Sequence, residues 1–200
     1  MKFRTSVTSP YARKCLIVAI EAGIDGRLEQ VPTAPWAADT DLPKDNPLGK
    51  IPALVTDGGE VLYDSPVICE YLDSLHGGRR LVPVSGGERW SQLRLEALAD
   101  GILDAAVAAR IEIALRPEDK RWPQWIERQN AAIDRGLDAL EGECAAWGDS
   151  FLIGQIAAAA ALGYLDFRAG PAWREPRPAL AAWFARASQR PSVAATVPKD

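Results

Sequence analysis

The feature that most constrains the fold is a change of pattern near residue 78. Strand-like and helix-like segments alternate before this point, and only helical spacing follows it. Segments of alternating type fold as a sheet covered by helices, whereas a run of helices builds a separate helical layer. The sequence therefore predicts an α/β domain followed by an all-α domain.

Two serine-proline pairs mark helix starts in the first region. Ser9-Pro10 and Ser65-Pro66 each precede a stretch with apolar residues at helical spacing. Serine is a favoured N-cap and proline a favoured first helical residue, so both serines are expected to cap a helix. Residues 57–59, Asp-Gly-Gly, predict a hairpin turn. We expect strands at 2–7, 28–31, 51–56 and 60–63.

The second region reads as a linker followed by helices. Residues 79–87 contain a proline and two glycines, which places the boundary between a domain at 1–78 and a domain at 88–200. Helical spacing runs from Glu88 to Arg116, and Pro117 ends it. Further helices are expected at 124–147, 153–168 and 178–189. The helix at 153 has no hydroxyl at its expected cap, so Asp149 or Ser150 would have to cap it instead.

Composition narrows the function classes. An apolar share of 48% with 25% charged residues is ordinary for a soluble globular protein. The net charge of -4 and the absence of a Lys/Arg block argue against a nucleic-acid partner. No apolar stretch is long enough for a signal core or a membrane span, so we expect a cytoplasmic protein. The three cysteines are far apart and form no C-x-x-C pair, which predicts neither a metal site nor a disulfide framework.

Three motifs in the chain carry a family resemblance. Asn-Pro-Leu-Gly-Lys-Ile-Pro-Ala-Leu at 46–54 is followed by Leu-Tyr-Asp-Ser-Pro at 62–66 and by Gly-Tyr-Leu-Asp-Phe-Arg at 163–168. In this order, over nearly the whole chain, they resemble the cytosolic glutathione S-transferases, above all bacterial members with a serine near the active site. The resemblance implies a thioredoxin-like domain that binds glutathione, an all-helical domain for a second substrate, and a homodimer.

The resemblance also implies a glutathione site. Ile51-Pro52 matches the family's cis-proline loop, in which the backbone of Ile51 would pair with the ligand. Proline adopts the cis form at a cost of only about 0.5–1 kcal/mol. Ser65 would hold the γ-glutamyl carboxylate at the start of a helix, where free N–H groups and the helix dipole favour an anion. Asp64 would meet the ligand's ammonium group.

Ser9 is the implied catalytic residue. A hydroxyl that donates to the glutathione sulfur stabilises the thiolate, which is the reactive form of a thiol. Ser9 would thus activate the ligand's nucleophile, although a pure capping role is the alternative. Cys15 falls in the apolar pattern, so no disulfide-exchange chemistry is expected from it. Other hydroxyls nearby could take the role of Ser9: Thr5, Ser6, Thr8 and Tyr11.

An acidic ridge is expected on the first helix of the second region. Glu96, Asp100 and Asp104 follow one another at four-residue spacing, which puts like charges side by side. One interpretation is a solvated face. The other is that Asp100 and Asp104 reach the ammonium of glutathione in the partner subunit, as acidic residues on this helix do in related proteins. Three further residues are candidates for the second-substrate pocket: Tyr11, Trp36 and Arg110.

Three functions fit these observations. The first is a glutathione transferase in which the thiolate attacks an electrophilic or peroxide substrate, with glutathione as co-substrate, no metal and a role in detoxification. The second is a glutathione-binding protein without turnover. The third is a protein-interaction module of the stringent-starvation type, which would not bind glutathione. The intact Ile51-Pro52 and Asp64-Ser65 pairs favour the first two.

Overall fold

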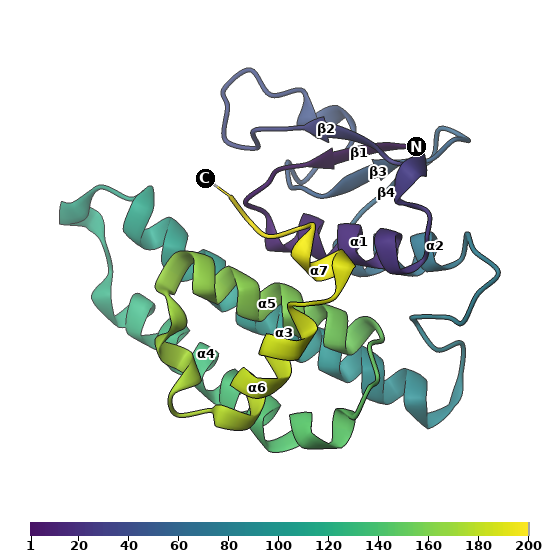
Figure 1. Ribbon diagram of the computed structural model, residues 1–200. Coiled ribbons are helices and arrows are strands. Elements are labelled where there is room, and N and C mark those ends of the chain that lie inside the picture. Colours follow the sequence, from purple (N-terminus) through teal and green to yellow (C-terminus); the bar gives the residue numbers. More distant parts are fainter. Residues whose placement is uncertain (200) are drawn as a thin grey trace.

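A four-stranded mixed sheet forms the N-terminal part of the computed structural model, which describes residues 1–199 (Figure 1). The strand order is β2-β1-β3-β4; β1 pairs with β2 in parallel and with β3 antiparallel, and β3 pairs with β4 antiparallel. Helices α1 and α2 cover the face of the sheet that looks toward the C-terminal helices. The elements are β1 (Lys2–Thr5), α1 (Pro10–Glu21), β2 (Glu29–Pro32), β3 (Ala53–Val55), β4 (Val61–Leu62) and α2 (Ser65–Asp73).

The C-terminal part contains only helices among the described residues. They are α3 (Gly86–Ala114), α4 (Pro123–Cys144), α5 (Ile153–Ala169), α6 (Pro178–Ala187) and α7 (Pro191–Ala194). Short 3-10 helices lie at Asp25–Arg27, Leu42–Lys44, Glu118–Lys120, Ala145–Trp147 and Pro171–Arg174. The expected combination of an α/β domain and an all-α domain is therefore confirmed.

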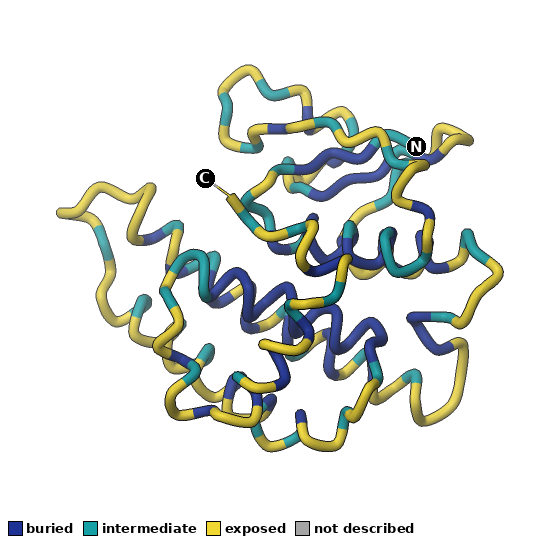
Figure 2. Tube along the Cα trace, viewed as in Figure 1, coloured by how far each residue is buried: buried dark blue, intermediate teal, exposed yellow. Residues whose placement is uncertain are grey.

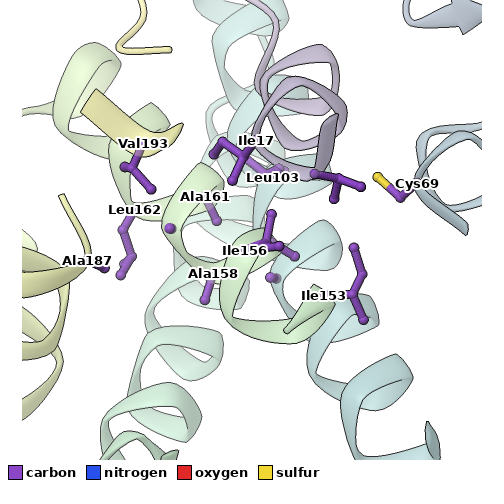
Figure 3. Packing of buried hydrophobic residues seen from close by; sticks show 14 of the residues in the cluster. Ile17, Cys69, Leu103, Ile153, Ile156, Ala158, Ala161, Leu162, Ala187 and Val193 are labelled. Atoms are coloured by element: carbon purple, nitrogen blue, oxygen red, sulfur yellow. The ribbon is translucent and has the colours of Figure 1, made fainter. Parts of the chain in front are cut away.

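Helix α5 is the centre of the molecule. It is buried continuously from Ile153 to Leu165, as the dark-blue tube in Figure 2 shows. A helix that is apolar on all sides belongs in a core, because it has no polar face to offer to water. It packs against α3 on one side and against α1 on the other. Figure 3 shows Ile17 of α1, Leu103 of α3 and Ile156 of α5 close together, so one apolar core is continuous across both parts.

The segment between the two parts is held in place by Asp73. This carboxylate is fully buried and accepts hydrogen bonds from the backbone N–H groups of Leu81 (2.8 Å) and Val82 (3.1 Å). Arg80 donates to it as well, at 2.8 Å. The linker expected at 79–87 is thus anchored to the end of α2 rather than free.

Several element boundaries differ from the sequence expectations. Helix α3 begins at Gly86, inside the expected linker, and ends at Ala114. Strand β3 is shorter than expected because Ile51 and Pro52 form the loop that leads into it. Helix α7 was not expected. The domain boundary at residue 78 remains a prediction, and residue 200, the expected end of the second domain, lies outside the described residues.

None of the described helices combines the length and the apolar character that a membrane crossing requires. Residues 1–199 also contain no group of three or more His, Cys, Asp or Glu side chains placed to hold a metal ion.

Candidate functional site

Ser9 lies at the start of α1 as its N-cap. Its Oγ accepts a hydrogen bond from the backbone N–H of Ala12 at 3.2 Å, and Pro10 is the first helical residue. The expected cap is therefore confirmed. A serine hydroxyl that accepts one hydrogen bond still has a proton to donate. Capping thus leaves Ser9 able to donate to a ligand at the positive end of the helix dipole.

The hydroxyl of Tyr11, two residues after Ser9, already has a hydrogen-bond acceptor. It donates to Oδ1 of Asp104 at 2.5 Å. Burial and this hydrogen bond to a carboxylate raise the pKa of Tyr11. Because a phenol has a single proton, Tyr11 has none left for a neighbouring sulfur. Of the other hydroxyls named from the sequence, Thr5 is buried on β1, and Ser6 and Thr8 form a hydrogen-bonded pair at 3.4 Å.

The loop before β3 is braced by Asn46. The Ile51-Pro52 peptide bond is cis, with Pro52 buried and Ile51 half-buried. The amide of Asn46 donates to the carbonyl of Lys50 at 2.8 Å, and its Oδ1 accepts from the N–H of Leu48 at 3.0 Å. Asn46 is 2% exposed. Sequence reasoning assigned no role to this residue, although an asparagine directly before Pro-Leu-Gly is a turn signal.

Helix α2 is capped differently from the sequence expectation. Its N-cap is Asp64, whose Oδ1 accepts from the N–H of Ser65 at 2.5 Å, and Ser65 is the first helical residue. The expectation that Ser65 caps this helix is wrong, because the carboxylate one position earlier takes that place. Ser65 is 1% exposed, and its buried Oγ has no hydrogen-bond partner among residues 1–199. Buried hydroxyls normally have a partner, so the hydroxyl of Ser65 is an exception to that rule.

The acidic residues of α3 divide into two kinds. Lys14 of α1 is fully buried, and its Nζ lies 2.9 Å from Oε1 of Glu96 and 2.6 Å from Oδ2 of Asp100. The interpretation of this ridge as a solvated face is therefore wrong for Glu96 and Asp100, which lie under α1. Asp104 is exposed and is the partner of Tyr11. Sequence reasoning missed Lys14, whose only local signal is a charged residue, next to Arg13, in a helix that is largely apolar.

Burial shifts the pKa values of ionisable side chains where α1 packs against α3. Burial raises the pKa values of Glu96 and Asp100, and the charge of Lys14 only partly opposes the effect. The charges of Asp64, Asp100 and Asp104 all add to the raised pKa of Tyr11. The carboxylates at the start of α2 and along α3 thus act on one region beside the start of α1. A region with this excess of negative charge attracts a cationic group.

Two of the pocket candidates are not joined to this region. Trp36 is 71% exposed on the loop after β2. Arg110 is exposed on α3, where its charge acts on Tyr164 of α5. No hydrogen bond or ion pair within residues 1–199 links either side chain to Ser9 or Ser65. Of the three candidates, only Tyr11 lies in this region: it follows Ser9 by two residues on α1 and donates a hydrogen bond to Asp104.

Comparison with known proteins gives consistent matches over the chain. The family model described as the glutathione S-transferase N-terminal domain matches residues 8–75, and that of the C-terminal domain matches residues 123–186. The uncharacterised GST-like protein YibF of Escherichia coli K12 is 38% identical over 99% of this chain and 98% of its own length. Glutathione S-transferase GstB of the same organism is 30% identical over 78% of this chain and 76% of its own length.

Solved structures agree with the sequence matches. A glutathione transferase family member from Pseudomonas fluorescens Pf-5, with bound glutathione, has a TM-score of 0.94 and 47% identity, covering 100% of this chain and 99% of its own. A glutathione S-transferase from Methylobacillus flagellatus KT, with glutathione bound, has a TM-score of 0.92 and 38% identity, covering 99% of each chain.

Proposed function

The chain belongs to the glutathione S-transferase family, and from this premise we propose that it is a glutathione transferase. It binds glutathione beside the starts of α1 and α2 and activates the thiol for attack on an electrophilic or peroxide substrate. Glutathione is the co-substrate, and the proposed reaction uses no metal.

The observation that carries this proposal is the unpartnered hydroxyl of Ser65. A buried polar group without a partner costs about 1–3 kcal/mol, and a ligand that supplies the partner recovers this cost. The γ-glutamyl carboxylate of glutathione suits the position, because Ser65 opens α2 and its surroundings carry the positive end of the helix dipole. The complexes of the Pseudomonas and Methylobacillus relatives with glutathione support the same ligand.

The remaining contacts of the proposed site follow from the ligand's shape. The cysteinyl backbone of glutathione pairs with the backbone of Ile51 as an added strand would, with Pro52 fixing the turn. Asp64 meets the ammonium group. Asp100 and Asp104 contact the ammonium of the ligand in the partner subunit; in support, Asp104 is exposed on α3.

Ser9 is the proposed activating group for the sulfur. A hydrogen bond to a charged acceptor contributes about 1.5–3 kcal/mol. Since each pKa unit corresponds to about 1.36 kcal/mol, one such bond lowers the pKa of the glutathione thiol by about 1–2 units. A thiol that ordinarily titrates near 8.5 is only a few per cent thiolate at pH 7. A pKa lower by about 1–2 units raises that share to roughly a quarter to three quarters.

We also propose a cytoplasmic homodimer without nucleic-acid or membrane partners. Support comes from two exposed apolar side chains, Val67 of α2 and Trp90 of α3, which are 49% and 69% exposed. The ion pair of Glu70 with Arg89, at 3.0 Å, joins these two helices near both residues. Sedimentation equilibrium should give the mass of two chains, and the mass of one would contradict the proposal.

The binding test is a calorimetric titration with reduced glutathione. We expect saturable binding of one ligand per chain. Ser65→Ala removes the unpartnered hydroxyl and should weaken binding by about 10-fold or more, since the lost bond goes to a carboxylate. Ser74→Ala, at the far end of the same helix, is the matched control and should bind like the wild type.

The outcomes separate the three functions. Binding together with turnover of an aryl halide or a hydroperoxide supports the transferase. Binding without turnover of any electrophile supports a glutathione-binding protein. No binding up to millimolar glutathione overturns both and leaves the protein-interaction module.

A further inference from the structure

A cavity lies between α1, α5, α6 and the segment that follows α7. Its volume is about 290 Å³, near the lower limit for small-molecule sites. None of the residues proposed for glutathione, at 9, 51, 52, 64 and 65, lines it. Its walls are largely apolar and include Phe167, Phe184, Val193 and Val197, but two arginines also face it, Arg13 and Arg174.

Arg13 enters this cavity from α1 as a buried charge. It is 6% exposed, and its Nη2 donates to the carbonyl of Val193 at 3.2 Å. Its Nη1 is buried and has no hydrogen-bond partner among residues 1–199. A methyl group on residue 163 would lie 1.9 Å from this nitrogen, so Gly163 leaves the space that the guanidinium occupies.

Arg174 brings a second unmet donor to the same cavity. Its Nη2 pairs with Asp166, whose carboxylate also accepts from Nε1 of Trp173 at 2.9 Å. Nε of Arg174 is buried and unpartnered within the described chain. The guanidinium groups of Arg13 and Arg174 therefore face a single carboxylate, that of Asp166. This carboxylate already accepts hydrogen bonds from Arg174 and Trp173. Burial lowers the pKa of Arg13 to about 10, and Asp166 opposes this effect only in part.

We propose that this cavity binds a small carboxylate with an apolar body, as a site separate from that of glutathione. The planar guanidinium group is the side chain best matched to a carboxylate, and the two unmet N–H donors supply its hydrogen bonds. The aromatic and aliphatic walls receive the apolar body. Both arginines line the cavity, but neither unmet nitrogen is open to solvent, so binding requires a small rotation of each guanidinium group toward the ligand.

The test uses benzoate as the probe, titrated into the protein with and without saturating glutathione. We expect one benzoate per chain and the same affinity in both titrations. Benzamide, which has the same ring without the charge, should bind at least 10-fold more weakly.

Three variants locate the probe. Arg174→Gln removes one charge and should weaken benzoate binding at least 10-fold, while leaving glutathione binding unchanged. Ser188→Leu fills the cavity with an apolar side chain from its wall and should abolish benzoate binding. Arg186→Gln, an exposed arginine of α6 outside the cavity, is the control and should bind benzoate like the wild type. Because Arg13 also holds α7, the test does not depend on an Arg13 variant that folds.

Four results would overturn the proposal. They are no saturable binding of benzoate, equal binding of benzamide, unchanged binding in both cavity variants, and competition between benzoate and glutathione. None of these results bears on whether glutathione itself binds, so this proposal and the proposed function can fail separately.

Discussion

At the scale of single residues, Ser9 combines two tasks that different substitutions can separate. Its oxygen caps α1 through the N–H of Ala12, while its proton is proposed to reach the glutathione sulfur. Serine and aspartate cap helices about equally well, but an ionised aspartate has no proton to donate.

The first prediction follows from this difference. Ser9→Asp should keep the free energy of unfolding within about 0.5 kcal/mol of the wild type and lose most transferase activity, because the cap stays and the donor goes. Ser9→Ala should lose both activity and about 1 kcal/mol of stability. Urea unfolding and the rate of glutathione conjugation measure the two effects. Full activity in Ser9→Asp would remove Ser9 from the catalytic role.

The second prediction concerns Gly163. An added methyl group would meet Nη1 of Arg13 at 1.9 Å, so Gly163→Ala should lower the free energy of unfolding by about 1–3 kcal/mol. The control is Gly101→Ala, where a methyl group meets nothing within 4 Å on the exposed side of α3. There the higher helix propensity of alanine should add up to about 1 kcal/mol. Equal effects at the two sites would show that Arg13 adapts without cost.

At the scale of elements, α1 and α3 are joined by the buried group of Lys14, Glu96 and Asp100. Removing one partner of a buried ion pair typically costs about 3–5 kcal/mol, because an uncompensated charge remains. The third prediction is that Lys14→Met loses stability of this order at neutral pH, measured by urea unfolding.

The pH dependence of that loss has a definite sign. Burial raises the pKa values of both carboxyl groups in the folded protein, and removing the charge of Lys14 raises them further. An acid with a raised folded pKa binds its proton more tightly when folded, so the folded state gains stability as the pH falls through that pKa. The stability deficit of Lys14→Met against the wild type should therefore shrink toward acidic pH. A constant deficit would mean that the two carboxylates are not the cause.

The helices also show where sequence reasoning was sufficient and where it was not. The starts of α1 and α2 could be predicted to within a residue because capping residues and prolines act locally. The start of α5 could not. Neither Asp149 nor Ser150 caps it; the N-cap is Leu152, Gln155 accepts from the N–H of Leu152, and Gln92 of α3 accepts from the N–H of Gly154, each at 3.0 Å.

The same distinction applies to the candidate site. Ser9, Ile51-Pro52 and Asp64-Ser65 were found because they form short motifs. The partners of Lys14 and of Tyr11 lie on α3, 82 to 93 residues further along the chain, and no local pattern links them. Only the packing of α1 on α3 and α5 decides which acidic residue is buried and which stays at the surface.

At the scale of the whole molecule, one apolar core extends through both parts of the chain. Ile17, Leu103 and Ile156 come from α1, α3 and α5 and belong to the same cluster (Figure 3). Parts that share a core lose the same contacts when either unfolds, which favours a single cooperative transition.

The fourth prediction is that urea unfolding is two-state. Six of the seven tryptophans lie in the second region, at 90, 122, 125, 147, 173 and 183, so fluorescence reports mainly on that part. Far-UV circular dichroism reports on both parts, and the two curves should coincide. Separate midpoints would mean that the parts unfold independently, despite the shared cluster.

The contacts of α1 also bear on how the chain folds while it is being synthesised. Glu21, at the end of α1, pairs with Arg190 across a separation of 169 residues, and Arg13 donates to Val193 across 180. Nascent chains generally fold from the N-terminus, domain by domain, as they leave the ribosome. Here the sheet and its helices emerge first, but one side of α1 has no cover until residues 190–196 have been translated. Helix α1 is thus translated long before its last partners, and the side of it that carries Arg13 and Glu21 reaches its native surroundings only when those partners follow.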